Sequence, residues 1–201
     1  MRYSKEHKTQ TRQRIIDTAA PLFRRFGFDG VSVDKLMNAA NLTRGGFYAH
    51  FKSKEALIET ILTRNAGLVR MLDDRPAQSR TDLNREALGI LSDYLDPANL
   101  EEIIEGCPLA TMPVDATRAS PRLRKAYGNR FAALIGQLRR GLGKRRRDED
   151  EAIALAVLAV GGILFARASS TDADAARVQQ ACSRVITRLM AEHSDGRKVA
   201  S

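Results

Sequence analysis

The chain has 201 residues, is 43% hydrophobic, lacks Trp and has only two cysteines, Cys107 and Cys182. This length suits one or two compact domains, and cysteines so far apart, without a Cys/His cluster, indicate neither a zinc site nor a disulfide framework. The net charge of +9 indicates a polyanionic partner, most commonly nucleic acid. Eleven Lys/Arg against six Asp/Glu in residues 1–60 place about half of the excess charge there.

The first 70 residues predict a series of helices separated by tight turns. Apolar residues recur at helical spacing over 9–26, and Gly27 follows as a stop signal. Ser32 is a good N-cap for a second helix that ends before Asn41, and Thr43 starts a third, very short one. Ser53 precedes a fourth helix, whose apolar positions continue to Leu68.

Two short helices joined by a tight turn after a longer helix are typical of the helix-turn-helix arrangement. The second short helix enters the major groove, so its first turn here would be Arg44, Gly45 and Gly46. Gly at this place lets the backbone approach DNA, and the helix N-terminus favours phosphate. Arg44 can hydrogen-bond guanine, and Tyr48 can reach a phosphate through its hydroxyl group. We expect Phe47 to point into the core.

Other interpretations of these residues stay open at this stage. The two glycines could permit close helix packing, and Arg44 could be an ordinary surface charge. Tyr48 could be a core residue with its hydroxyl group at the rim. His50 could contact phosphate or lie half-buried beside Phe51.

Residues 12–58, RQRIIDTAAPLFRRFGFDGVSVDKLMNAANLTRGGFYAHFKSKEALI, resemble the DNA-binding domain of the TetR/AcrR family of bacterial transcriptional repressors. The resemblance includes the IIDTAA start, the FGFDG and AANLT turns, the FYAHF helix and the SKEAL boundary. It implies an all-α subunit that dimerises through C-terminal helices and leaves DNA when a small ligand binds. From helix positions and resemblance together, the predicted DNA-binding residues are Ser32, Val33, Lys35, Thr43, Arg44, Gly45, Gly46, Tyr48, His50 and Lys54.

Beyond residue 70 the helical pattern continues, and no strand pattern of useful length appears. Residues 73–81 are predicted to be a polar linker, and residues 139–151 an exposed loop broken by Gly141 and Gly143. Further helices are predicted at 82–95, 101–117, 121–142, 150–168 and 172–193. The predicted fold is all-α, with a helix-turn-helix domain over 1–55 and a helical ligand-binding and dimerisation domain over 56–201.

The two last helices, 150–168 and 172–193, are strongly apolar. The first is apolar nearly all round, which predicts burial on more than one side. Together they suit a four-helix bundle in a homodimer, which would match a palindromic operator in double-stranded DNA. An ordinary core within one chain is the alternative. The apolar run 152–166 is shorter than the ~20 residues of a membrane span, so no membrane partner is expected.

The middle helices offer an apolar lining for a small apolar or amphipathic effector. Cys107, between Gly106 and Pro108, lies at a predicted helix start that favours a thiolate; inert packing is the other interpretation. Some members of the resembled family sense electrophiles through a cysteine in a related Gly-Cys opening. The predicted ligand-binding residues are Leu91, Tyr94, Ile104, Cys107, Met112, Phe131, Ile135 and Phe165.

These features predict a cytoplasmic, ligand-responsive transcriptional repressor. Two other functions stay open: a repressor that senses electrophiles or redox state through Cys107, and a non-specific structural DNA-binding protein. An enzyme is not expected, because three scattered His residues offer no catalytic pair and no Gly-rich phosphate loop or GxSxG motif occurs. No cofactor or metal is expected. The polar, basic N-terminus lacks the apolar segment of a secretory signal.

Overall fold

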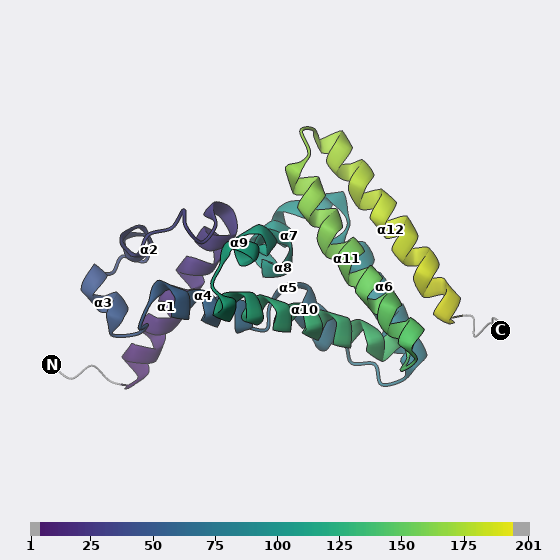
Figure 1. Cartoon of the computed structure of the whole chain (residues 1–201), viewed down its shortest axis with the longest axis horizontal. Coiled ribbons are helices and arrows are strands. Elements are labelled where there is room, and N and C mark those ends of the chain that lie inside the picture. Colours follow the sequence, from purple (N-terminus) through teal and green to yellow (C-terminus); the bar gives the residue numbers. More distant parts are fainter. Residues whose placement is uncertain (1–4, 195–201) are drawn as a thin grey trace. The chain divides into compact units, whose positions relative to one another are not determined.

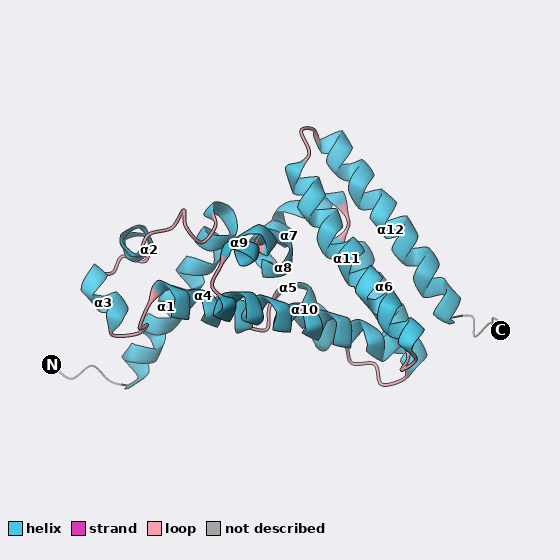
Figure 2. Cartoon of the chain, viewed as in Figure 1, coloured by secondary structure: helices cyan, strands magenta, loops and turns pink. Residues whose placement is uncertain are grey.

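A computed structural model describes residues 5–194 of the chain. All regular structure in this range is helical, which confirms the predicted all-α class (Figure 2). The chain forms two compact units (Figure 1). The first contains the chain up to Arg64 together with Thr111–Gly128, and the second contains Asn65–Ala110 and the chain from Asn129 onward.

The first unit is built around a core of fully buried aromatic and aliphatic side chains, including Ile15, Phe23, Leu36, Phe47 and Leu57. The segment 111–128 belongs here because Met112, Leu123 and Ala126 are buried in the same core. Its helices are α1 (Lys5–Phe26), α2 (Val33–Ala39), α3 (Arg44–Tyr48), α4 (Lys54–Thr63), α9 (Pro113–Arg118) and the start of α10 (Pro121–Leu142).

The first unit extends past the domain boundary predicted after residue 55. That boundary falls inside α4, whose buried residues Leu57, Ile58, Ile61 and Leu62 all belong to the first core. Hydrogen bonds also tie the segment 111–128 to the helices before it. The Asp115 carboxylate accepts a 2.8 Å bond from the Phe28 backbone N–H, and the Arg122 guanidinium pairs with Glu59. The unit is therefore discontinuous in sequence, which helical periodicity alone does not reveal.

The second unit contains the long C-terminal helices. Figure 1 shows α11 and α12 running side by side in opposite directions, and α6 packs against α12. Its remaining helices are short and occupy the stretch between α6 and α10. The elements are α5 (Gly67–Asp73), α6 (Arg80–Tyr94), the 3-10 helix η1 (Pro97–Asn99), α7 (Leu100–Gly106), most of α8 (Pro108–Thr111), the rest of α10, α11 (Arg146–Ala168) and α12 (Asp172–Ser194).

The predicted long helix after Ser53 is in fact two helices, α4 and α5. The chain is extended at Arg64 and Ala66, and Gly67 has a φ of +56°. This left-handed conformation suits Gly because it carries no Cβ. A Cβ at residue 67 would lie only 2.9 Å from the Cα atom of Cys107. The break lets the backbone at Gly67 lie directly against Cys107.

The helical stretch predicted over 101–117 is divided in the structure into α7, α8 and α9, and the helix start predicted beside Cys107 is confirmed at Pro108. The breaks fall at Cys107 and Met112, each of which precedes a proline. A proline disfavours the helical conformation of the residue before it, and Cys107 accordingly has an extended backbone, with φ −107° and ψ 107°. Pro108 and Pro113 then occupy helix starts, where the missing N–H has no cost.

The exposed loop predicted over 139–151 is only three residues long, from 143 to 145. Gly141 lies inside α10, where a Cβ would come within 2.9 Å of the Asn84 backbone. Gly143, with a φ of +152°, ends the helix. Asp148 is buried rather than exposed, because its carboxylate accepts hydrogen bonds from the Arg145 backbone and guanidinium at the start of α11.

The polar connection between α5 and α6 is anchored by a buried arginine. The guanidinium of Arg75 donates hydrogen bonds to the carbonyl oxygens of Leu72 and Leu83, both at 2.6 Å, and of Gln137 at 2.7 Å. Burial lowers the pKa of Arg75. One side chain thus holds α5, α6 and α10 together, so this segment is not the free linker that its polarity predicts.

Candidate nucleic-acid interface

The turn between α2 and α3 has the geometry of a Schellman motif. The Leu42 N–H donates to the Met37 carbonyl at 2.8 Å, and the Asn41 N–H donates to the Asn38 carbonyl at 3.0 Å. Asn41 has a φ of +51°, a left-handed conformation that Asn tolerates better than most residues. This turn fixes the direction in which α3 leaves α2, as a helix-turn-helix requires.

Helix α3 separates a buried face from an exposed one within five residues. Phe47 is completely buried, as predicted, and its ring lies 5.7 Å from that of Phe51. Tyr48, the next residue, is 58% exposed, so its ring is not part of the core. The exposed face of α3 therefore carries Arg44, Gly45 and Tyr48 together.

Intramolecular packing does not account for the glycines of α3. A Cβ at Gly45 would have no atom within 4 Å, and one at Gly46 would make only ordinary contacts of 3.6–3.7 Å with Thr43 and Met37. Each Gly nevertheless costs the helix roughly 1 kcal/mol relative to Ala. Close approach of another molecule to this backbone explains them better than close packing within the chain.

The Arg44 guanidinium is held by an acidic residue of α2. Its Nη1 atom lies 3.0 Å from Oδ2 of Asp34, and both side chains are more than half exposed. Such an exposed pair stabilises the fold by only about 0.2–1 kcal/mol. Its effect is to fix the direction of Arg44, while the remaining N–H groups of the guanidinium stay available as donors.

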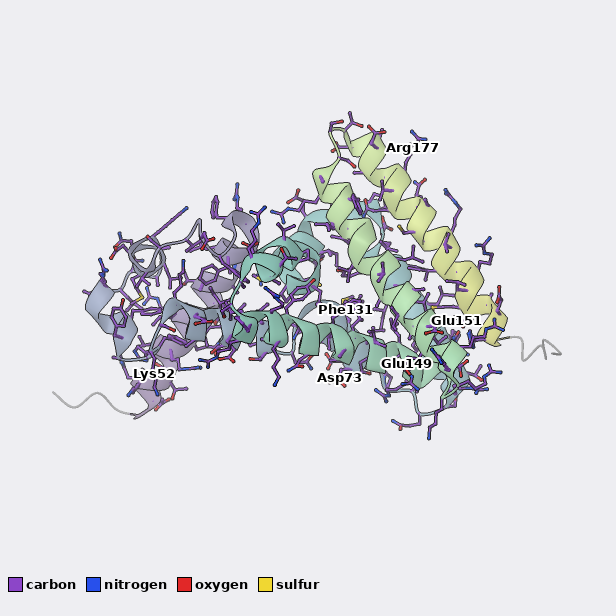
Figure 3. All side chains as sticks on the ribbon, in the orientation of Figure 1. Lys52, Asp73, Phe131, Glu149, Glu151 and Arg177 are labelled. Carbon is purple, nitrogen blue, oxygen red and sulfur yellow. The ribbon has the colours of Figure 1, made fainter. Side chains whose placement is uncertain are left out.

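Lys54 has a structural role that the sequence did not predict. Its ammonium group donates to the backbone carbonyls of Phe28 at 2.8 Å and Val31 at 3.3 Å. It therefore ties the start of α4 to the segment before α2. Lys52, two residues earlier, is exposed (Figure 3). Its signal in the sequence is its position next to the α4 cap.

Positive charge gathers around His50. Burial, which disfavours the imidazolium, lowers the pKa of His50, and the charges of Lys8, Arg12 and His7 lower it further. The Nδ1 atom of His50 is buried without a hydrogen-bond partner among the described residues. Arg12 also lies over the Phe51 ring, with Cζ 4.7 Å from its centroid. The beginning of α1 thus adds basic groups to the same region, which helix pattern alone did not identify.

The other predicted DNA-binding residues border the two short helices. The Ser32 hydroxyl caps α2 by accepting from the Lys35 N–H at 3.1 Å, and the Lys35 ammonium lies 4.0 Å from the centroid of the Phe26 ring. Val33 is half-buried. Thr43 precedes α3 at the N-cap position, but its side chain makes no capping hydrogen bond.

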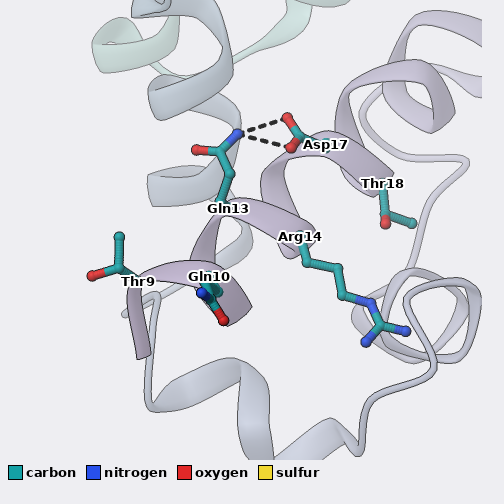
Figure 4. A pocket seen from close by; sticks show the side chains of 6 residues that line it. All are labelled: Thr9, Gln10, Gln13, Arg14, Asp17 and Thr18. Atoms are coloured by element: carbon teal, nitrogen blue, oxygen red, sulfur yellow. Dashed lines mark hydrogen bonds between the residues drawn. The ribbon is translucent and has the colours of Figure 1, made fainter. Parts of the chain in front are cut away.

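A surface hollow lies along one face of α1 (Figure 4). The Gln13 amide donates to both oxygens of Asp17 at 2.8 and 2.9 Å, and Asp17 also pairs with Arg64 of the same unit. These contacts satisfy the carboxylate, so we assign this hollow no ligand. It is lined by Thr9, Gln10, Gln13, Arg14, Asp17 and Thr18.

The predicted ligand-binding residues do not all come together. Leu91, Tyr94 and Cys107 are buried in the second unit, where Phe131 and Ile135 of α10 are half-buried. Met112 belongs instead to the core of the first unit. Phe165 is 66% exposed on α11. The Ile104 side chain lies outside the described residues.

The Cys107 thiol has polar neighbours. The Tyr94 hydroxyl donates to Sγ at 3.2 Å, and Arg130 donates to the Ala66 carbonyl in the same region. Burial lowers the pKa of Arg130, while attraction to Cys107 opposes that shift. Cys107 is only 1% exposed.

A group of possible metal ligands lies where α11 begins and α12 ends (Figure 3). The possible ligand atoms of Asp148, Glu151 and His193 all lie within 4.8 Å of one another. Basic side chains already engage both carboxylates, since Arg145 pairs with Asp148 and both Arg147 and His193 pair with Glu151. Burial raises the pKa of Glu151, but hydrogen bonds from His193 and Arg147 outweigh it. The group is therefore an ion-pair network that joins the two helices.

Residues 15–61 match the family model of bacterial regulatory proteins of the tetR family. The helix-turn-helix segment of the chain is therefore similar to that of TetR-family regulators. It is 40% identical over 60 residues to the regulator AcrR of Shigella flexneri, a match that covers 30% of this chain and 28% of that protein. It is 23% identical over 146 residues to the transcriptional repressor NemR of Escherichia coli, covering 72% and 73% of the two chains.

The TetR-type fold extends over nearly the whole chain. A TetR-family regulator from Cytophaga hutchinsonii superimposes with a TM-score of 0.71 at 24% identity, covering 94% of this chain and 98% of that one. The reduced form of E. coli NemR gives a TM-score of 0.69 at 21% identity, covering 89% and 96%. The first curated relatives are matched over only 27–47% of their own length, and the family model matches residues 15–61.

Proposed function

We propose that this protein is a cytoplasmic transcriptional repressor that binds a palindromic operator as a homodimer and leaves it when a small molecule binds the second unit. The observation that carries the DNA-binding part is α3. Its exposed face presents an arginine, an open glycine backbone and a tyrosine, and Phe47 anchors the opposite face in the core. This is the arrangement that a recognition helix needs to reach base edges in the major groove.

Dimerisation is supported by an apolar stripe on α11. Ile153, Val157 and Phe165 are 38%, 54% and 66% exposed, and with Gly161 they repeat every four residues, so they lie on one helix face. The opposite face of α11 is buried in the second unit. Water-exposed apolar stripes of this kind commonly mark an interaction surface. We propose that the stripe, with α12 beside it, pairs with the same surface of a second copy.

Among the described residues, α11 also meets the length and composition of a membrane span, with 44% of its most apolar window buried. Helix α11 packs along α12 and against α7. Glu149 and Glu151 in its first turns form ion pairs with Arg139 and Arg147. These contacts support a core helix with one face left for a partner subunit.

The effector is proposed to bind around α6 in the second unit and to be apolar or amphipathic, because the buried candidates on α6, Leu91 and Tyr94, are aliphatic and aromatic. It must bind the DNA-free arrangement of the dimer more tightly than the DNA-bound one, since equal affinity would shift nothing.

A second candidate function, thiol-based sensing, rests on the polar surroundings of Cys107. The Tyr94 hydroxyl donates a hydrogen bond to Sγ of Cys107, and Arg130 lies in the same region. Burial of the thiol opposes access by a reagent.

The proposal is tested by selecting operator sequences from random DNA and measuring binding at ~150 mM salt with excess competitor DNA. A specific repressor retains a symmetric site whose half-sites are about one helical turn apart, or a multiple of this spacing. A protein that loses most of its affinity under these conditions, on every sequence alike, is a non-specific binder.

A further inference from the structure

Gln179 on α12 is a polar residue without a polar partner. Its side chain is 0% exposed, yet neither the amide nitrogen Nε2 nor the carbonyl oxygen Oε1 has a hydrogen-bond partner among the described residues. A buried polar group left unpaired destabilises a fold by about 1–3 kcal/mol. A buried amide with both ends unpaired therefore requires an explanation.

The residues one turn away from Gln179 on α12 have small side chains. Ala175, one turn before it, is buried, and Cys182 and Ser183, one turn after it, are half-buried. Cys182 packs against α11 at Gly162, where a Cβ would lie 3.3 Å from Sγ. That Cβ would also lie 2.7 Å from the Leu95 side chain, which follows α6. Because α12 packs against both α6 and α11, we infer that the Gln179 amide, which has no hydrogen-bond partner among the described residues, faces the junction of these three helices.

We propose that Gln179 is the polar contact of the effector site, an assignment that rests on the proposed ligand response. The amide presents an NH2 donor group and a carbonyl acceptor side by side. The group that satisfies both carries an acceptor and a donor in the same geometry: a carboxamide, a lactam or a protonated carboxylic acid. The effector is then a small apolar molecule that bears one such group, and the apolar part packs among the aliphatic side chains of the junction.

The test uses two matched pairs: wild type with a Gln179 variant, and a polar ligand with its apolar analogue. Gln179→Leu keeps the side-chain shape and removes both polar atoms. Benzamide is compared with isopropylbenzene, in which two methyl groups replace the amide oxygen and nitrogen. Binding is measured by thermal shift and calorimetry without DNA, so that it does not depend on operator release.

The ligand-free Gln179→Leu variant should melt several degrees above wild type, because it no longer buries an unpaired amide. Benzamide should bind wild type at least tenfold more tightly than the variant, whereas isopropylbenzene should bind the variant at least as well. Equal benzamide affinity for both proteins overturns the assignment. A lower melting temperature for the variant also overturns it, since the amide must then be satisfied in the ligand-free protein by a buried water.

Operator affinity is measured separately with and without benzamide. If benzamide binds through Gln179 and operator affinity is unchanged, the assignment of Gln179 to a ligand site is supported, and the proposal that ligand binding releases DNA is wrong. If the Gln179→Leu results fail but other apolar compounds release the operator, the proposed function stands and the assignment of Gln179 is wrong.

Discussion

The Arg44 guanidinium and the Asp34 carboxylate form a 3.0 Å ion pair that links α3 to α2 on the exposed surface of the first unit. The pair orients the side chain that is best placed to read a base. Because both partners are more than half exposed, solvent screening leaves little stabilisation of the fold. Their importance should therefore appear in DNA recognition and not in the free energy of unfolding.

Replacement of Arg44 by Ala should cost roughly 1–3 kcal/mol of operator binding and relax base preference at one position of each half-site. Asp34→Ala should increase affinity for scrambled DNA, because it removes a negative charge, and reduce discrimination, because Arg44 is no longer oriented. Titration of operator and scrambled duplexes by fluorescence anisotropy checks both variants. An unchanged ratio of the two affinities in Arg44→Ala would falsify the base-reading role.

Lys52 and Lys54 are a matched pair for separating phosphate binding from folding. Lys54→Ala should destabilise the protein by about 1–3 kcal/mol, because its two backbone carbonyl partners lose their donor. Lys52→Ala should leave stability unchanged and reduce the slope of log affinity against log salt concentration by about 1. Urea denaturation and salt titrations measure the two effects. Equal destabilisation by both variants would contradict the structural role of Lys54.

Operator binding should strengthen as pH falls from about 7.5 to about 6. Burial and neighbouring cations lower the pKa of His50 in the free protein, so its imidazole is neutral near pH 7. A DNA phosphate beside it would favour the charged form, and binding would then take up a proton. His50→Gln should flatten this part of the pH profile. A profile that is unchanged in the variant shows that His50 does not face phosphate.

The lowered pKa of His50 affects folding in the opposite direction, because a fall in pH weakens the stability of the DNA-free protein. A histidine whose pKa is lowered in the folded state stabilises the fold at pH values above its unfolded-state pKa of about 6.5. That contribution is lost as pH falls through the folded-state pKa. Urea denaturation of the DNA-free protein between pH 7.5 and 5 should therefore show a smaller loss of stability in His50→Gln than in wild type. The pH dependences of binding and of stability thus separate the two roles.

The α11 stripe should hold the dimer together. Val157→Glu places a charge among exposed apolar residues that pair with a second copy in the proposed dimer, and burying an unpaired charge is costly. We expect a monomer by analytical ultracentrifugation and loss of cooperative operator binding. Val114→Glu is the control, because Val114 is exposed to a similar extent, 52%, but lies on α9. If Val157→Glu stays dimeric, subunits pair through another surface.

Thiol sensing makes a separate prediction. N-ethylmaleimide should modify Cys107 before Cys182 and release the operator, and Cys107→Ser should prevent release. Cys182 is the internal control, because it is the more accessible of the two thiols and faster modification of Cys107 could not come from exposure. Peptide mapping by mass spectrometry with parallel binding assays distinguishes the two thiols. A Cys107→Ser protein that responds like wild type assigns Cys107 to packing.

Local signals in the sequence were sufficient for the N-terminal helices. Apolar spacing, the caps at Ser32 and Ser53, and the stop at Gly27 predicted helix positions, because each depends on residues within one or two turns. The buried position of Phe47 and the all-α class followed from the same short-range pattern. Pro108 carried a local signal that predicted a helix start, which α8 confirms, but the helical pattern over 101–117 did not show that the stretch divides into three helices.

Long-range contacts decided what local pattern could not. Nothing near Lys54 in the sequence indicates that its ammonium group bonds the carbonyls of Phe28 and Val31, and nothing near Met112 places it in the first unit. Phe165 and Leu91 look alike as apolar helix residues, yet one is exposed and the other fully buried. Gln179 is a polar residue that is nevertheless fully buried, on a helix that packs against α6 and α11. Helical periodicity fixes which residues share a face, but only the packing of distant helices determines what that face meets.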